Sequence, residues 1–159
     1  MWKREELNNM KVLVTGVKGQ LGYDIVKECE KRNIDAIGVD IDEMDITNPA
    51  QVEEVIKDAK VDAVIHCAAW TAVDKAEDEI ELCRKVNKEG PANIAKVCEE
   101  LDIPMMYFST DYVFDGQGEE PWMEYGFLNC NEKSTNTIID TLLLESKHNF
   151  ESYYKTVHL

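Results

Sequence analysis

The stretch Lys11-Val-Leu-Val-Thr15, followed directly by Gly16-Val-Lys-Gly19-Gln-Leu-Gly22, decides the fold of this chain. The apolar run predicts a buried β-strand, and the amphipathic residues that continue to about Arg32 predict a helix. Glycines at such a junction permit a tight turn, close approach of a pyrophosphate to the backbone, and close packing of helix on strand. The spacing is G-x-x-G-x-x-G, and a packing turn that binds no phosphate has the same look. The interpretation therefore depends on the elements that come after this turn in the chain.

Strands and helices alternate along the next ninety or so residues. The predicted elements are, in order, a strand at 34–39, a helix from 48 to about 60, a strand at 62–67, a helix from about 78 to 101, and a strand at 104–109. Pro91 should kink the long helix, because it has no amide to donate to the carbonyl of Asn87. The alternation predicts an α/β fold, a Rossmann-like doubly wound parallel sheet with right-handed crossovers. The continuous apolar runs indicate strands buried on both faces.

The 159 residues suffice for one domain with a core. We expect a polar leader at 1–10, a dinucleotide-binding domain at 11–118, and a tail of unassigned structure at 119–159. No apolar run reaches the ~18 residues of a membrane span, and the first residues do not form a secretory signal.

The composition excludes several classes of partner. There are 17 basic and 32 acidic residues, a net charge of −15, so binding to nucleic acid or to an anionic membrane is not expected. A helix N-terminus can still bind a small phosphate locally. The 5 cysteines are widely spaced with no C-x-x-C pair, and the 3 histidines are scattered, which predicts reduced thiols, no metal site and a cytoplasmic protein.

Polar residues at three further places suggest a site. Asp40 ends the second predicted strand, where a carboxylate accepts hydrogen bonds from ribose hydroxyls and repels a 2′-phosphate. Asn87 interrupts an apolar helix stripe, so it either ties the helix to a neighbouring backbone or acts near an active site. Ser109-Thr110-Asp111 follows the fourth strand at the edge where ligands bind in open α/β sheets, although a polar turn would look the same.

Four stretches carry a resemblance to a known family: VTGVKGQLG at the glycine turn, MDIT at 44–47, CAAWTAVDKAE at 67–77 and STDYVFDG at 109–116. Residues 11–116 thereby resemble the cofactor-binding half of the extended short-chain dehydrogenase/reductases. Within that family they are most similar to the dTDP-4-dehydrorhamnose reductases, which reduce a 4-keto sugar nucleotide. The resemblance implies a nicotinamide cofactor, NADH or NADPH depending on the member, and a dTDP-sugar as substrate. Asp40 favours NADH, with NADPH possible.

The resemblance also implies roles for individual residues. Gly19, Gln20 and Leu21 would lie along the pyrophosphate. Asp40 would hold the adenosine ribose, with Asp45 and Ile46 beside the adenine. The nicotinamide side would be lined by Ala69, Trp70 and Thr71. The implied cofactor-binding residues are Gly16, Gly19, Gln20, Leu21, Gly22, Asp40, Asp45, Ile46, Ala68, Ala69, Trp70, Thr71, Asn87 and Ser109. The implied catalytic residues, which would touch the sugar, are Thr110 and Asp111.

One family feature is missing. Members place a Tyr-x-x-x-Lys pair after the STDYVFDG stretch, the tyrosine donating a proton that the lysine helps to release. Here only Tyr23 and Lys27 have that spacing, on the helix after the glycine turn, and we interpret them as a coincidence. We therefore expect a shortened chain with little or no catalysis. The alternatives are a non-catalytic regulatory protein of the family or another sugar-nucleotide enzyme of it. An unpaired last strand would also favour a homodimer.

Overall fold

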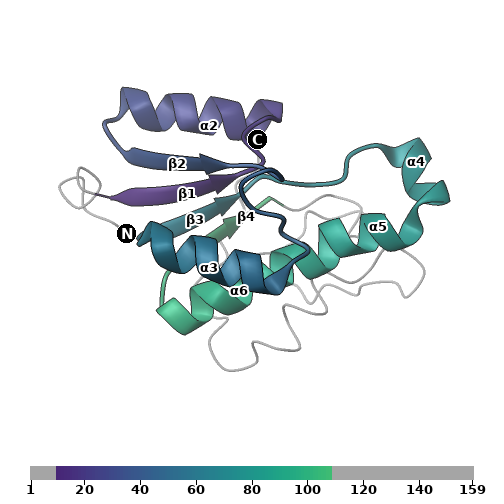
Figure 1. Ribbon diagram of the computed structural model, residues 1–159. Helices are drawn as coiled ribbons and strands as arrows, with labels where there is room; N and C mark the ends of the chain where they lie inside the picture. The colour runs from purple at the N-terminus through teal and green to yellow at the C-terminus, as the bar shows by residue number, and fades with distance from the viewer. Residues whose placement is uncertain (1–9, 109–159) are drawn as a thin grey trace, which may run out of the picture. The chain divides into compact units, whose positions relative to one another are not determined.

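A parallel four-stranded sheet forms the centre of the computed structural model, which describes residues 10–108 (Figure 1). The strands are β1 (Lys11–Thr15), β2 (Asp35–Val39), β3 (Ala63–His66) and β4 (Met105–Tyr107), in the order β2-β1-β3-β4. The sequence-based prediction of a parallel, Rossmann-like sheet is confirmed. The register sets Thr15 beside both Val39 and His66, and His66 beside Tyr107, so the carboxyl ends of all four strands meet at one edge.

Helices cover both faces of the sheet, so the domain has three layers (Figure 1). Helix α2 (Gln20–Lys31) packs its Cys29 against Val12 and Val14 of β1 on one face. Helices α3 (Pro49–Ala59) and α6 (Gly90–Leu101) pack on the other face, where β1 presents Leu13. This alternation follows from the period of two in a strand, which sends successive side chains to opposite faces.

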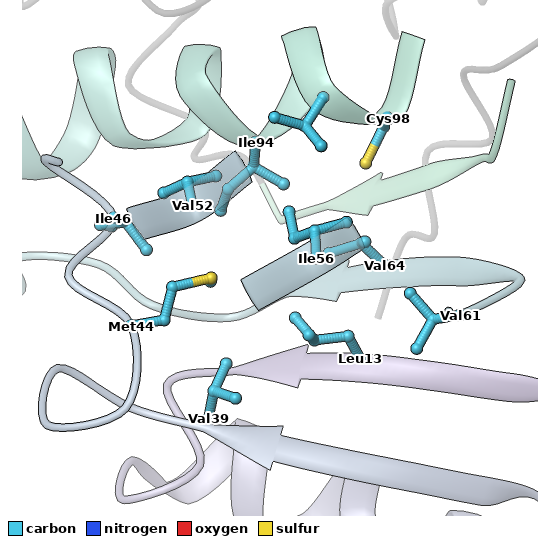
Figure 2. Close-up of a cluster of buried hydrophobic side chains, with 11 residues drawn as sticks. Leu13, Val39, Met44, Ile46, Val52, Ile56, Val61, Val64, Ile94 and Cys98 are labelled. Carbon is cyan, nitrogen blue, oxygen red and sulfur yellow. The ribbon is translucent and has the colours of Figure 1, made fainter. Parts of the chain in front are cut away.

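The larger of the two cores lies under α3 and α6 (Figure 2). Leu13, Val64, Val52, Ile56 and Ile94 are completely inaccessible to solvent there. They come from two strands and two helices, so the cluster joins the separate βαβ units into one domain. Its removal from water is the main stabilising contribution to this fold.

Helix α3 begins and ends as its sequence predicts. The side chain of Asn48 accepts a hydrogen bond from the amide of Gln51, and Pro49 occupies the first turn, where its missing N–H costs nothing. The helix stops at Lys60, which adopts a left-handed conformation with φ 50°.

The predicted single helix from about Asp78 to Leu101 is wrong in its detail. The structure has two short helices, α4 (Val73–Asp78) and α5 (Ile80–Arg84), then a π-helical segment η1 (Lys85–Glu89) that runs into α6. The amide of Gly90 donates to the carbonyl of Lys85, five residues back. The widened turn immediately precedes Pro91, which lacks the amide that a regular α-helix would need at that position.

The prediction that the strands are buried on both faces holds for β1 and less for the strands at the ends of the sheet. Residues 12–15 are all buried, whereas Asp35 and Gly38 of β2 and Met106 of β4 are exposed. The central position of β1 matters for the site, because the glycine turn continues directly from this rigid strand. Among residues 10–108, the structure contains no helix long and apolar enough to span a bilayer.

Candidate nucleotide-binding site

The glycine turn leaves β1 in a conformation that only its first glycine adopts easily. Gly16 has φ 70°, in the left-handed region. A Cβ atom there would lie 2.7 Å from the amide nitrogen of Ala68 and 2.8 Å from its Cα. Gly16 therefore allows the turn to lie directly against the backbone that follows β3. The glycine turn and the backbone of Cys67 and Ala68 therefore lie against each other at the carboxyl edge of the sheet.

The other two glycines differ in what surrounds them. Gly22 is buried in the first turn of α2, and a Cβ atom there would lie 2.4 Å from the carbonyl oxygen of Gly16. Gly19 is exposed, has φ −80°, and would bring a Cβ atom no nearer than 3.2 Å to that oxygen. Gly22 is thus required by packing, whereas Gly19 keeps the solvent side of the turn free of side-chain atoms.

The N-terminus of α2 is available to an anion. Gly19 is its N-cap, no side chain caps it, and its first turn contains no acidic residue. Backbone N–H groups at such a terminus, together with the helix dipole, attract a phosphate. Gln20 and Leu21, predicted to lie along a pyrophosphate, are exposed in this first turn. The local geometry therefore fits the group that the sequence predicts.

Asp40 lies beside the glycine turn at the end of β2. One carboxylate oxygen accepts a hydrogen bond from the amide of Lys18 at 2.9 Å, and the other from the amide of Ile41 at 2.9 Å. The ammonium group of Lys18 pairs with Asp42, and this hydrogen bond raises the pKa of Lys18. Asp40 is thereby held in a fixed orientation, and its carboxylate oxygens retain lone pairs for further donors.

The loop that contains Asp45 and Ile46 is fixed at both residues. One oxygen of the Asp45 carboxylate accepts from the amide and the hydroxyl of Thr47, at 2.9 and 2.8 Å. The carbonyl of Ile46 accepts from the side-chain amide of Asn93 at 2.9 Å. A Cβ atom on Gly90 would lie 2.6 Å from Cδ1 of Ile46, so glycine lets α6 approach this loop without displacing that side chain. The side chain of Ile46 is buried, and Asp45 is partly buried.

The segment after β3 is held by the π-helical segment. The side-chain oxygen of Asn87 accepts from the amide of Trp70 at 2.7 Å, and its nitrogen donates to the carbonyl of Trp70 at 3.1 Å. The same nitrogen lies 3.6 Å from the sulfur of Cys83. Asn87 thus ties a helix to a neighbouring backbone with both ends of its amide. Ala69 and Thr71, predicted to face the nicotinamide, lie on either side of this clamp, and both are exposed.

The coincident pair Tyr23 and Lys27 lies on α2. Tyr23 is 56% exposed, the Lys27 ammonium lies 5.8 Å from its ring centroid, and Lys27 also pairs with Glu30 at 2.9 Å. Both side chains are exposed, away from the buried face of α2.

Ser109, Thr110 and Asp111 lie outside the described residues. Within residues 10–108, no cluster of His, Cys, Asp or Glu could hold a metal ion.

Sequence reasoning missed two buried polar residues at this edge. Thr15 and His66 are each 1% exposed and join their side chains at 2.7 Å, and the Thr15 hydroxyl oxygen also accepts from the amides of Cys67 and Ala68. The available signal was that two apolar strands, β1 and β3, both end in a polar residue. Asn93 and Gly90 were also missed, because neither is near the glycine turn in sequence.

Comparison with known proteins places this arrangement in a family. The RmlD substrate binding domain model matches residues 10–129. The dTDP-4-dehydrorhamnose reductase of Streptomyces griseus is 38% identical over 112 residues, which cover 70% of this chain and 37% of that protein. The chain spans about two-fifths of the length of the curated relatives it matches.

Two solved structures are similar as well. A dTDP-4-dehydrorhamnose reductase from Clostridium acetobutylicum is 40% identical with a TM-score of 0.71, over 79% of this chain and 44% of that one. The Bacillus anthracis dTDP-4-dehydrorhamnose reductase, solved in complex with NADP, is 36% identical with a TM-score of 0.68, over 74% and 42%. The glycine turn, the parallel sheet and these matches agree, and the chain belongs to the RmlD substrate-binding domain family, whose solved and curated relatives include the dTDP-4-dehydrorhamnose reductases.

Proposed function

We propose that this chain provides the nicotinamide-dinucleotide-binding part of a reductase that acts on a dTDP-linked 4-keto sugar. The observation that carries the proposal is the uncapped N-terminus of α2 behind an exposed Gly19. The relative from Bacillus anthracis, which binds NADP, supports the class of ligand. The bound dinucleotide would supply the hydride that reduces the sugar ketone.

Each part of the carboxyl edge has its own task in this proposal. Gln20 and Leu21 bind the pyrophosphate through backbone amides. Gly19, whose own amide donates to the carbonyl of Gly16 at 3.0 Å, leaves room for the pyrophosphate because it has no side chain. Asp40 accepts hydrogen bonds from the hydroxyls of the adenosine ribose. Asp45 and the backbone of Ile46 border the adenine. A further set of residues after β3 borders the nicotinamide: Ala68, Ala69, Trp70 and Thr71.

We assign NADH as the preferred cofactor because of Asp40. Its carboxylate is fixed by two amides and cannot easily turn away, so a 2′-phosphate on the ribose would meet a negative charge. Asp42 and Glu43 add two further acidic groups next to it, against the single cation of Lys18. The resulting negative charge disfavours the binding of NADPH, which has an extra phosphate, relative to NADH.

The chain's own residues do not complete the catalytic step. Reduction of a ketone requires a proton for the developing alkoxide, and a positioned acid contributes roughly 10²- to 10⁴-fold. The family's Tyr-x-x-x-Lys pair has no counterpart in the 159 residues other than Tyr23 and Lys27, which lie on the exposed side of α2. Thr110 and Asp111 remain as the proposed contacts to the sugar. We propose that this chain binds the cofactor and turns over little or no substrate.

The experiment that tests the proposal is a fluorescence titration of the 159-residue chain with NADH and with NADPH. Saturable binding of NADH, tighter than that of NADPH, is the expected result. Equal or tighter binding of NADPH would contradict the assignment of the cofactor while leaving the dinucleotide site intact. A non-catalytic regulatory role is the second candidate, favoured by the missing pair, and tight binding without turnover would retain it.

A further inference from the structure

A row of three side chains crosses the sheet beside the glycine turn. Thr15, His66 and Tyr107 are brought level by the register of β1, β3 and β4. The Thr15 hydroxyl oxygen lies 2.7 Å from Nδ1 of His66, and the rings of His66 and Tyr107 stack with centroids 5.6 Å apart and an interplanar angle of 16°. Neither Thr15 nor His66 is accessible to solvent beyond 1%. Nothing in the function proposed above uses this row.

The contacts of Thr15 determine where its proton lies. Its hydroxyl oxygen accepts from the amide of Cys67 at 3.1 Å and from the amide of Ala68 at 3.2 Å. A hydroxyl has two lone pairs and one hydrogen, so two amide donors leave only its own hydrogen for His66. Nδ1 of His66 must then be the acceptor. Burial lowers the pKa of His66 to about 4, so near neutral pH the ring is uncharged and carries its hydrogen on Nε2.

We propose that His66 is a positioning residue for the glycine turn. As the Nε2–H tautomer it accepts the Thr15 hydroxyl hydrogen and thereby directs both lone pairs of that oxygen to the amides of Cys67 and Ala68. Those amides belong to the backbone that lies against Gly16, where even a Cβ atom would come within 2.7 Å. A ring with its hydrogen on Nδ1 would compete for one of the two lone pairs and release an amide. The consequence for ligand binding rests on the proposed dinucleotide site.

The surroundings of the second ring nitrogen of His66 indicate that this side chain does not serve to stabilise the fold. Nε2 is buried and has no hydrogen-bond partner among the described residues. A buried N–H without an acceptor destabilises a fold, and an apolar side chain of similar volume would avoid this penalty. What an apolar side chain would not provide is the acceptor for Thr15. The acceptor Nδ1 is therefore the feature of the ring that an apolar side chain could not replace.

The direct test is the tautomeric state of His66, measured from the ring nitrogen resonances of the 15N-labelled full chain near neutral pH. We expect a protonated Nε2 and an unprotonated Nδ1 for His66. In Thr15→Val the hydroxyl is gone, and we expect the His66 Nδ1 resonance to move. A ring that is protonated at Nδ1 in the wild-type chain would overturn the proposal. This readout needs no cofactor, so it stands or fails independently of the proposed function.

A pair of variants tests the consequence. His66→Asn places an amide oxygen where Nδ1 was and keeps an acceptor, whereas His66→Leu fills the space without one. We expect faster hydrogen exchange at the amides of Cys67 and Ala68 in His66→Leu only, and NADH binding weakened about fivefold in that variant, the equivalent of one hydrogen bond. Unchanged exchange in a folded His66→Leu would overturn the proposal. If His66→Leu does not fold, the tautomer measurement still decides.

Discussion

At the scale of single residues, the three glycines of the turn differ in what surrounds them. Gly16 and Gly22 are enclosed by backbone atoms at 2.7 and 2.4 Å, whereas Gly19 is exposed. The sequence could predict that a glycine-rich turn joins strand to helix. It could not show which glycine faces a ligand, because that depends on how closely the segment after β3 approaches.

Asp40 gives the first prediction at this scale. Asp40→Ala should weaken NADH binding by roughly 1–2 kcal/mol, the range for a charge-assisted hydrogen bond, and should narrow the difference between NADH and NADPH. The measurement is a fluorescence titration with both cofactors. Asp58→Ala is the matched control, since it removes the same charge from an exposed position on α3 and should leave both affinities unchanged. Equal effects of the two variants would show that only net charge matters.

His66 gives a prediction about pH. Burial depresses its pKa from 6.5 to about 4, so the folded state favours the neutral ring and the unfolded chain binds a proton first. The corresponding stability is fully present above pH 6.5 and is lost as the pH falls towards about 4. Over that window, urea denaturation should show that the free energy of unfolding falls by roughly 3 kcal/mol more in wild type than in His66→Asn. A tenfold change in proton affinity corresponds to about 1.4 kcal/mol. Parallel pH profiles of the two proteins would contradict this.

The pairing of Thr15 with His66 shows what the sequence alone left open. Both residues end apolar strands, but their contact requires β1 and β3 to be neighbours in the correct register, and the two positions are 51 residues apart. An isolated buried histidine in a strand has no periodic pattern to mark it. The sheet order, not the local sequence, creates the pair.

At the scale of elements, the π-helical segment η1 is the informative departure from a regular fold. The sequence correctly indicated that Asn87 needs hydrogen-bond partners within an apolar stripe, and the kink predicted at Pro91 stays a prediction. It could not indicate that the helix widens before the proline or that the partner is the backbone of Trp70. The β1–α2 and α3 units were predictable because their start signals are local, whereas α4 and the break at Glu79 follow no local pattern.

Asn87→Ala should destabilise the domain by about 1–3 kcal/mol, because both the amide and the carbonyl of Trp70 lose a partner. The free energy of unfolding, from urea denaturation followed by circular dichroism, measures this. Lys85→Ala in the same π-helical segment is the control, since Lys85 is exposed and should change stability by no more than about 0.5 kcal/mol. Equal stability of the two variants would mean that the clamp on Trp70 contributes nothing.

At the scale of the whole molecule, the chain combines the proposed dinucleotide site with part of a family pattern. The family match covers residues 10–129, and the curated relatives are more than twice as long as the part that aligns. The strongly acidic balance, −15, opposes polyanionic partners and leaves the helix N-terminus as a local site for a phosphate group. Fold and family were predictable from the sequence, because the strand–turn–helix unit and four motifs are continuous in it. The side-chain hydrogen bonds that join separate βαβ units were not predictable from the sequence.

The catalytic prediction belongs to this scale. Purified chain should show no NADH oxidation above background with dTDP-4-keto-6-deoxy-L-mannose, because the only Tyr-x-x-x-Lys spacing in the sequence is that of Tyr23 and Lys27, which lie on α2. The decrease in NADH absorbance measures it, with a full-length dTDP-4-dehydrorhamnose reductase as the positive control. Turnover within about tenfold of that control is a smaller loss than the roughly 10²- to 10⁴-fold expected without a general acid, and would mean that another tyrosine donates the proton. Replacing Tyr125, Tyr153 and Tyr154 in turn by phenylalanine would then identify it.

The most direct measurement of the central claim is a calorimetric titration of NADH into the chain and into its Gly19→Val variant. The account predicts a single saturable site in the wild-type chain and no detectable binding by the variant, with both proteins equally folded by circular dichroism. The valine side chain would occupy the exposed side of the turn that the pyrophosphate needs. Unchanged affinity in Gly19→Val, or a folded wild-type chain that does not bind NADH, would contradict the account and leave the glycine turn as a packing feature only.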